Sequence, residues 1–258
     1  MLNNLRLAWL SRRFWWFIAT SRTRARFART SLGSFWLGFS NLLSIGTLGI
    51  VYGTVFSVPN FKEYFIYLGI GLVIWNSISL SIASGPELFL NNTQNIKNMN
   101  INPIVYTFEE WSFQLQTFFQ SFTLVFIVLF FLKKILIYNL LIFSLFPLIN
   151  LIIFLYWFPL MIALIGIRYS DFTQLVPIVL QLTFLTSPIL YRKESLGGLE
   201  WITNYNLIYK ILDPLRLSII DGILDYKAVI IIFLINIFGL CTSLALLKKQ
   251  SKDLPFLI

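Results

Sequence analysis

Long runs of apolar side chains alternate with short polar segments along this chain. Each run is close to the roughly 20 residues that an α-helix needs to cross a bilayer core about 30 Å thick. Backbone polar groups inside a membrane must be paired within their own segment, which favours helices. The pattern therefore predicts an all-α integral membrane protein with six transmembrane helices, over Leu32–Phe56, Tyr64–Ala83, Phe113–Leu132, Leu140–Ile167, Phe172–Leu190 and Ala228–Leu247.

Residues 1–30 carry a different pattern, in which apolar positions recur at helical spacing among arginines. This arrangement is typical of an amphipathic helix that lies in the membrane interface, with its apolar side toward the lipid and its cations toward anionic headgroups. A simple cluster of charges that only sets the topology is the alternative. The residues that we expect to anchor the helix are Leu7, Leu10, Phe14, Trp15 and Phe17.

The distribution of lysine and arginine predicts the orientation of the chain. Six crossings place both termini on one side, and that side carries most of the basic residues because the N-terminal segment is rich in arginine. Cytoplasmic loops carry an excess of lysine and arginine. We therefore expect both termini in the cytoplasm, although Lys133 and Lys134 fall on the opposite side and count against it.

Two of the predicted loops within the membrane domain, residues 31–258, are long enough to hold structure of their own. The cytoplasmic stretch 91–110 is polar and rich in asparagine, and it predicts a short helix closed by Pro103. The external stretch 191–227 contains Gly197-Gly198 and a moderately apolar run after them. That run is too short and too interrupted to span the membrane, so it predicts re-entrant or interfacial helices, with an ordinary external loop as the alternative.

Composition excludes several classes of function. Hydrophobic residues make up 57% of the chain and charged residues 12%, and the net charge of +9 arises mainly at the ends of spans, so we expect no nucleic-acid binding. Histidine is absent and Cys241 is the single cysteine, so no metal site is expected. No glycine precedes a lysine, so the chain lacks a phosphate-binding loop and is not expected to hydrolyse ATP.

The spans themselves are poor in ionisable groups and rich in aromatic ones. Transport driven by protons or sodium ions normally leaves ionisable groups inside spans, and we find none in Leu32–Phe56, Leu140–Ile167 or Phe172–Leu190. The chain has 26 phenylalanines, 11 tyrosines and 8 tryptophans. Aromatic faces pack against the C–H surfaces of sugars, so a neutral aromatic conduit suits a glycan, although lipid-facing bulk explains most individual phenylalanines.

Four blocks of the chain resemble the membrane subunits of type-two ABC exporters, the branch that moves O-antigen, capsular and teichoic polysaccharides. Their order and spacing make the resemblance fairly specific, although the family usually has Asn-Pro where this chain has Asn206-Leu207. The blocks are Arg26–Trp36 before the first span, Asn91–Pro103 at the position of the coupling helix, Arg168–Asp171 before the fifth span, and Phe184–Tyr191 followed by Asn206 and Arg216.

The resemblance implies an ATP-driven exporter of a lipid-linked, O-antigen-like polysaccharide across the bacterial inner membrane. Two copies of the chain would form a homodimeric pore, and two copies of a separate ATPase subunit would bind ATP and Mg²⁺. The N-terminal helix would act as a cytoplasmic gate and residues 191–227 as an outer gate. The resemblance assigns ATPase coupling to Asn95, Ile96, Lys97, Asn98, Met99, Asn100 and Ile101, and an aromatic pore lining to Tyr52, Phe56, Phe184 and Tyr191.

Three other functions remain open from the sequence. The same fold would serve an exporter of a drug or of a small lipid, because no motif specifies the substrate. A membrane-embedded glycosyltransferase or phosphotransferase would need acidic residues gathered to hold magnesium, and the cytoplasmic side offers few of them. A purely structural membrane scaffold is the third alternative.

Overall fold

The computed structural model describes residues 2–98, 102–251 and 253–257, and within these residues it is helical and contains no strand. Five helices, α3, α4, α6, α8 and α12, are long and apolar enough to cross a membrane. The chain is therefore an all-α protein of the membrane type. The helices are α1 (Leu2–Leu10), α2 (Arg12–Phe27), α3 (Phe35–Val55), α4 (Phe61–Ala83), α5 (Thr93–Asn98), α6 (Pro103–Leu132), α7 (Leu136–Ile142), α8 (Leu145–Gly166), α9 (Phe172–Thr186), α10 (Trp201–Tyr205), α11 (Leu207–Ile220), α12 (Tyr226–Gln250) and α13 (Leu254–Leu257), with 3₁₀ turns η1 (Leu90–Asn92) and η2 (Lys193–Leu199).

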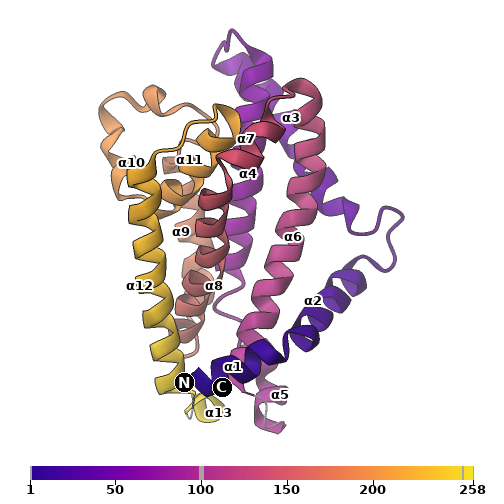
Figure 1. Cartoon of the computed structure of the whole chain (residues 1–258), viewed down its shortest axis with the longest axis vertical. Helices are drawn as coiled ribbons and strands as arrows, with labels where there is room; N and C mark the ends of the chain where they lie inside the picture. Colours follow the sequence, from indigo (N-terminus) through magenta and orange to yellow (C-terminus); the bar gives the residue numbers. More distant parts are fainter. Residues whose placement is uncertain (1, 99–101, 252, 258) are drawn as a thin grey trace.

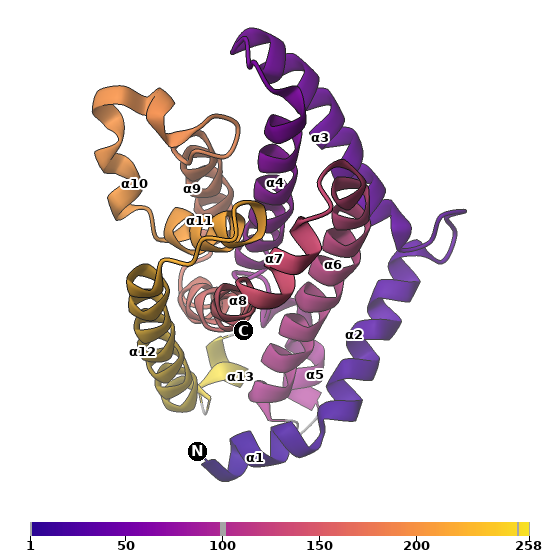
Figure 2. The same ribbon diagram turned by 45° about the horizontal axis from the view of Figure 1, so that its top comes forward.

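Helix α4 forms the centre of the bundle, where it packs against α3, α6, α8, α9 and α11. In its most apolar stretch 72% of the residues are buried, against 17% in α3 and 28% in α12. Figure 2 shows α3 and α12 on opposite sides of the bundle. Helices α1, α5 and α13 lie together at one end, and α7, α10 and α11 lie toward the other (Figure 1). We call these the α5 end and the α11 end.

Helix α6 begins ten residues before the predicted span Phe113–Leu132. The side chain of Asn102 accepts a hydrogen bond from the backbone N–H of Ile104, and Pro103 occupies the first turn, where its missing N–H costs nothing. The proline therefore starts a helix. As a result, much of the stretch 91–110, which the sequence predicts to be a loop with a short helix, belongs to α6.

Two other predicted spans differ in the structure. The stretch Leu140–Ile167 overlaps two helices, because the chain bends at Ser144 between α7 and α8. The side chain of Asn139 donates to the backbone oxygen of Ile219, which holds α7 against α11. The stretch Phe172–Leu190 contains the 15-residue helix α9, which ends where Ser187 adopts an extended conformation. A sixth helix of full spanning length is thus not found among the described residues.

The N-terminal segment forms two helices where the sequence predicts one. The backbone carbonyl of Ala8 accepts hydrogen bonds from the Ser11 hydroxyl at 2.8 Å and from the Trp15 indole at 3.0 Å. These side chains satisfy a carbonyl that a continuous helix would pair with its own backbone. The chain can therefore bend at Ser11, and α1 and α2 both pack on α6.

Buried amides join α8 to α12. Asn236 donates to the backbone oxygen of Asn150 at 3.0 Å and accepts from the indole of Trp157 at 2.9 Å. Asn150 donates in turn to the backbone oxygen of Val229. Polar side chains that pair across helices hold membrane bundles together, because lipid offers them no alternative partner.

Candidate functional site

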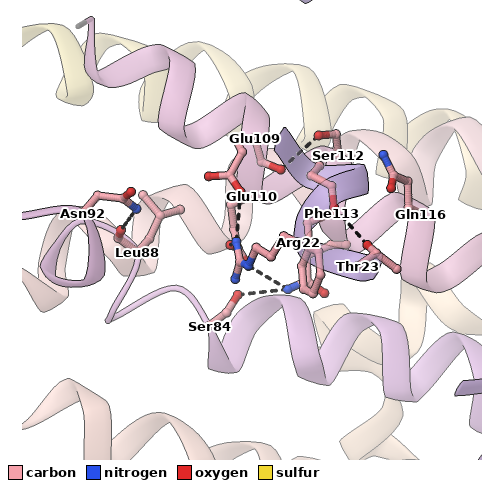
Figure 3. Close-up of polar contacts among 12 residues, drawn as sticks. Arg22, Thr23, Ser84, Leu88, Asn92, Glu109, Glu110, Ser112, Phe113 and Gln116 are labelled. Carbon is pink, nitrogen blue, oxygen red and sulfur yellow. Dashed lines mark hydrogen bonds and ion pairs between the residues drawn. The ribbon is translucent and has the colours of Figure 1, made fainter. Parts of the chain in front are cut away.

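An arginine on α2 joins this helix to α6 at the α5 end (Figure 3). Nη1 of Arg22 lies 3.2 Å from Oε1 of Glu109 and 2.6 Å from Oε2 of Glu110. Its guanidinium carbon also lies 4.2 Å from the centroid of the Phe113 ring. The side chain thus makes two ion pairs and a cation–π contact with one face of α6.

The ion pairs extend into a network that reaches α4. Nε2 of Gln114 donates to Glu110 at 2.8 Å and to the hydroxyl of Ser84, just beyond the end of α4, at 3.3 Å. The two glutamate side chains are 10% exposed, whereas Arg22 is 44% exposed. Burial opposes the charge of Arg22, but the nearby carboxylates of Glu110 and Glu109 outweigh it and raise the pKa of the guanidinium. The network therefore couples α2, α6 and the end of α4 electrostatically.

Aromatic side chains make a second connection between the N-terminal helices and the bundle. The indole of Trp15 stacks on Phe108 with ring centroids 5.4 Å apart, and Phe108 stacks on Tyr156 of α8 at 5.1 Å. The hydroxyl of Tyr156 is 3.1 Å from that of Thr107. Trp15 is only 4% exposed. Trp15 is one of the five residues predicted to anchor the gate helix in the membrane interface, but the structure packs its side chain inside the bundle.

The other four predicted gate residues lie on the outside. Leu7, Leu10, Phe14 and Phe17 are all between 49% and 68% exposed. Phe14 and Phe17 on α2 are spaced so that they share one helical face, whereas Leu7 and Leu10 lie on α1. An exposed apolar face on a helix next to a membrane bundle is suited to contact lipid, and its role as a gate stays a prediction.

The predicted coupling residues fall on and just after α5. Asn95, Ile96, Lys97 and Asn98 belong to this helix, whereas Met99, Asn100 and Ile101 lie outside the described residues. Ile96 is buried and its three helical neighbours are exposed. Helix α13 packs against α5, so the end of the chain supports it. Helix α5 thus presents a small exposed polar surface at this end of the bundle.

A buried arginine organises the α11 end. Arg216 of α11 is 1% exposed and donates from Nη1 to the backbone oxygen of Pro188 at 2.7 Å, while Nη2 pairs with Asp213. Its guanidinium carbon lies 3.9 Å from the centroid of the Tyr67 ring. Burial opposes the charge, but Tyr67 and Asp213 outweigh it, and the pKa of Arg216 is raised. The cation therefore stays charged in a buried slot between α4 and α11.

The same slot fixes the segment 187–191, which follows α9 and turns at residues 188 and 189. The hydroxyl of Tyr67 donates to the carbonyl of Pro188 or Tyr191, at 2.9 and 3.0 Å, and that of Tyr64 donates to the carbonyl of Leu190 at 2.6 Å. The amide of Asn206 donates to the hydroxyl of Ser187 at 2.8 Å. Buried backbone carbonyls outside a helix need such partners from the protein.

The four predicted pore residues lie in two places in the structure, and their role in a pore stays a prediction. Tyr52 stacks on Phe56 with centroids 5.7 Å apart, and Phe56 and Tyr191 line a common cavity of about 320 Å³ between α4 and the segment after α9. Phe184 instead packs against Trp75, at 5.4 Å between ring centroids. Three of the four therefore gather near the α11 end, and Phe184 lies against the bundle.

No protein-family model and no curated protein matches this chain. Among the described residues, no group of three or more histidine, cysteine, aspartate or glutamate side chains is placed to hold a metal ion. Sequence reasoning missed the partnership of Arg22 with Glu109 and Glu110. A pair of acidic residues at the start of a strongly apolar run was the available signal, because such residues need a cationic partner when they are buried.

Proposed function

We propose that this chain is the transmembrane subunit of an ATP-driven exporter for a lipid-linked, O-antigen-like polysaccharide in the bacterial inner membrane. It acts as a homodimer, with both termini in the cytoplasm. ATP and Mg²⁺ bind to two copies of a separate ATPase subunit. The proposal grows from the resemblance of four sequence blocks, and the physical arrangement of the α5 end supports it.

The observation that carries the proposal is the connection from α5 to the bundle. Helix α5 lies between the end of α4 and the start of α6, so a force on α5 acts on both. Helix α6 is bound to α2 through Arg22 and through the stacked rings of Trp15 and Phe108. A partner that displaces α5 therefore moves α6 and the N-terminal helices together. This is the mechanical arrangement that an external ATPase needs in order to drive a pore.

The sixth crossing of the membrane consists of α9 and the segment after it. Fifteen helical residues rise about 22 Å, which is less than a bilayer core of about 30 Å, and the segment 187–191 after α9 extends this crossing beyond the end of the helix. The carbonyls of this non-helical stretch are paired by Tyr64, Tyr67 and Arg216, which makes its position inside the membrane energetically acceptable. Helices α10 and α11 then form the outer gate.

The exposed apolar surface of α3 needs cover, which lipid or a second copy of the chain supplies. Leu43, Ile50 and Val55 on this helix are about half exposed or more. In the dimer these surfaces face the partner copy or lipid, and the aromatic group of Tyr52, Phe56 and Tyr191 lies near the outer end of the conduit. Aromatic faces of this kind let a neutral sugar chain slide without strong binding.

Purification of the tagged chain from its native membranes tests the proposal. Mass spectrometry should identify a stoichiometric subunit that carries a phosphate-binding loop. The variant Lys97→Glu, on the exposed side of α5, should lose much of this subunit, whereas Lys62→Glu at the opposite end of the bundle should retain it. A stable chain that purifies without any such subunit contradicts the proposal. Equal recovery from both variants removes the assignment of α5 as the coupling helix.

A further inference from the structure

A polar cleft opens between α3, α4 and α6, toward the end of the bundle where α2 meets α6. Its volume is about 300 Å³, at the lower end of the range for small-molecule sites. The nine uncharged polar residues that line it are Ser40, Asn41, Ser44, Asn76, Ser77, Ser79, Gln114, Thr117 and Ser121, and Arg26 is the charged one. No acidic residue is among the lining residues that the structure describes. Hydroxyls and amides that line a cavity in a membrane bundle cost free energy unless a polar group occupies the cavity and hydrogen-bonds to them.

One buried group in the cleft lacks a partner. The hydroxyl of Ser77 makes no hydrogen bond, although the residue is only 8% exposed. A buried hydroxyl without a partner is unfavourable, because it has lost its bonds to water and gained none. Ser77 lines the cleft, so a ligand there would complete its hydrogen bonding.

The other polar groups are arranged so that the cleft both donates and accepts hydrogen bonds. The hydroxyls of Ser44 and Thr117 donate to carbonyls of their own helices, at 3.0 and 2.9 Å, and this leaves their oxygen lone pairs free to accept. Asn76 donates to the side-chain oxygen of Asn41 at 2.6 Å, which fixes the two amides across α3 and α4. Arg26 contributes only donors and a positive charge.

We propose that this cleft binds a phosphorylated sugar headgroup, with sugar hydroxyls against Ser77, Asn76 and Thr117 and the phosphate at Arg26. Sugar hydroxyls both donate and accept, as the neutral part of the lining requires. Arginine pairs with phosphate through charge-assisted hydrogen bonds, and the absence of carboxylates from the lining avoids repulsion. This inference deepens the proposed function and rests on it for the role of the ligand, because it names the part of a lipid-linked glycan that the chain recognises.

Binding to the full chain in nanodiscs of neutral phosphatidylcholine tests the proposal. Isothermal titration with glucose-1-phosphate, glucose and inorganic phosphate separates the contributions of the sugar and of the phosphate. We expect glucose-1-phosphate to bind at least about tenfold more tightly than either fragment. Arg26→Gln should weaken its binding about tenfold, and Ser44→Leu, which narrows the cleft from an exposed position on α3, should abolish it.

Two matched variants serve as controls. Arg29→Gln removes an exposed arginine, and Thr54→Leu replaces an exposed hydroxyl of α3, both outside the cleft, so both should bind like the wild type. Binding of glucose-1-phosphate no tighter than that of inorganic phosphate overturns the sugar part of the proposal. If phosphatidylglycerol in the nanodisc abolishes the binding of glucose-1-phosphate, the sugar part of the proposal is also overturned, because an ordinary lipid headgroup would then occupy the cleft. Unchanged binding by Arg26→Gln and Ser44→Leu overturns the location.

The outcome is independent of the test for the ATPase subunit. A chain that binds glucose-1-phosphate in the cleft but purifies without an ATPase keeps the site and loses the exporter function. A chain that purifies with an ATPase but fails to bind the probe keeps the exporter function and loses the site.

Discussion

The ion pairs between α2 and α6 give the sharpest prediction about stability. The substitution Arg22→Gln keeps a polar side chain of moderate length at this position but removes the positive charge that pairs with Glu109 and Glu110. Two carboxylates, each about 10% exposed, are then left side by side without that partner. Two negative charges that lie side by side repel each other, and burial keeps water from screening this repulsion.

The magnitude follows from the burial of the partners. Breaking a fully buried ion pair costs about 3–5 kcal/mol, and breaking an exposed pair costs less than about 1 kcal/mol. Arg22 is 44% exposed and its partners are 10% exposed, so the burial of these ion pairs is intermediate between the two cases. We therefore expect Arg22→Gln to lower the free energy of unfolding by about 2 kcal/mol.

Titration with a denaturing detergent measures this free energy in the purified protein. Arg24→Gln, on the same helix and exposed, should change it by less than about 0.5 kcal/mol. The triple variant Arg22→Gln, Glu109→Gln, Glu110→Gln should recover most of the loss, because it removes the unpaired charges as well. A loss no greater than that of Arg24→Gln would refute the reasoning, as would a triple variant no more stable than Arg22→Gln alone.

Two further substitutions test the packing of other parts of the bundle. Arg216→Gln removes the charge that holds the carbonyl of Pro188. We expect it to lower the free energy of unfolding by about 3 kcal/mol and to speed protease cleavage of the segment after Pro188, and wild-type stability would contradict the role given to this arginine. Gly239→Ala places a methyl group about 2.5 Å from the ring of Trp157 and should lower the free energy of unfolding by about 1–3 kcal/mol in the same titration. The control Gly46→Ala meets no atom within 4 Å and should leave this free energy unchanged. Equal results for the two variants would show that α12 does not pack closely on α8.

The hydrophobic pattern predicts three of the long helices well because their ends are marked locally. Helices α3, α4 and α12 lie within a few residues of the predicted spans, since polar residues flank each apolar run. The start of α6 was missed because Asn102 and Pro103 let a helix begin outside the apolar window. The bend at Ser144 depends on Asn139, whose partner lies 80 residues away in the chain, and no local pattern reveals such a contact.

The candidate site shows the same division between local and distant information. The block Phe184–Tyr191, Asn206 and Arg216 was recognisable as a set of residues, and the structure brings these residues into contact through Ser187 and Pro188. Their joint task, to satisfy backbone carbonyls after α9, depends on Tyr64 and Tyr67, more than 120 residues earlier. Arg22 pairs with Glu109 and Glu110, which lie 87 and 88 positions later in the chain. The periodicity of apolar residues does not predict this contact either.

The buried slot around Arg216 has a consequence for how the protein is made. When the chain inserts into the membrane from its N-terminus, α3 is the first of the long apolar helices to insert. Little of α3 is buried by the rest of the protein, so this helix is stable in lipid with few protein contacts. Arg216 comes late, and a lone guanidinium is expensive in hydrocarbon. Its acceptor at Pro188 and the ring of Tyr67 already exist by then, because α4 and α9 precede it in synthesis. Docking of α11 is therefore the step that completes the α11 end of the bundle, and a ribosome that stalls before residue 216 leaves that end incomplete.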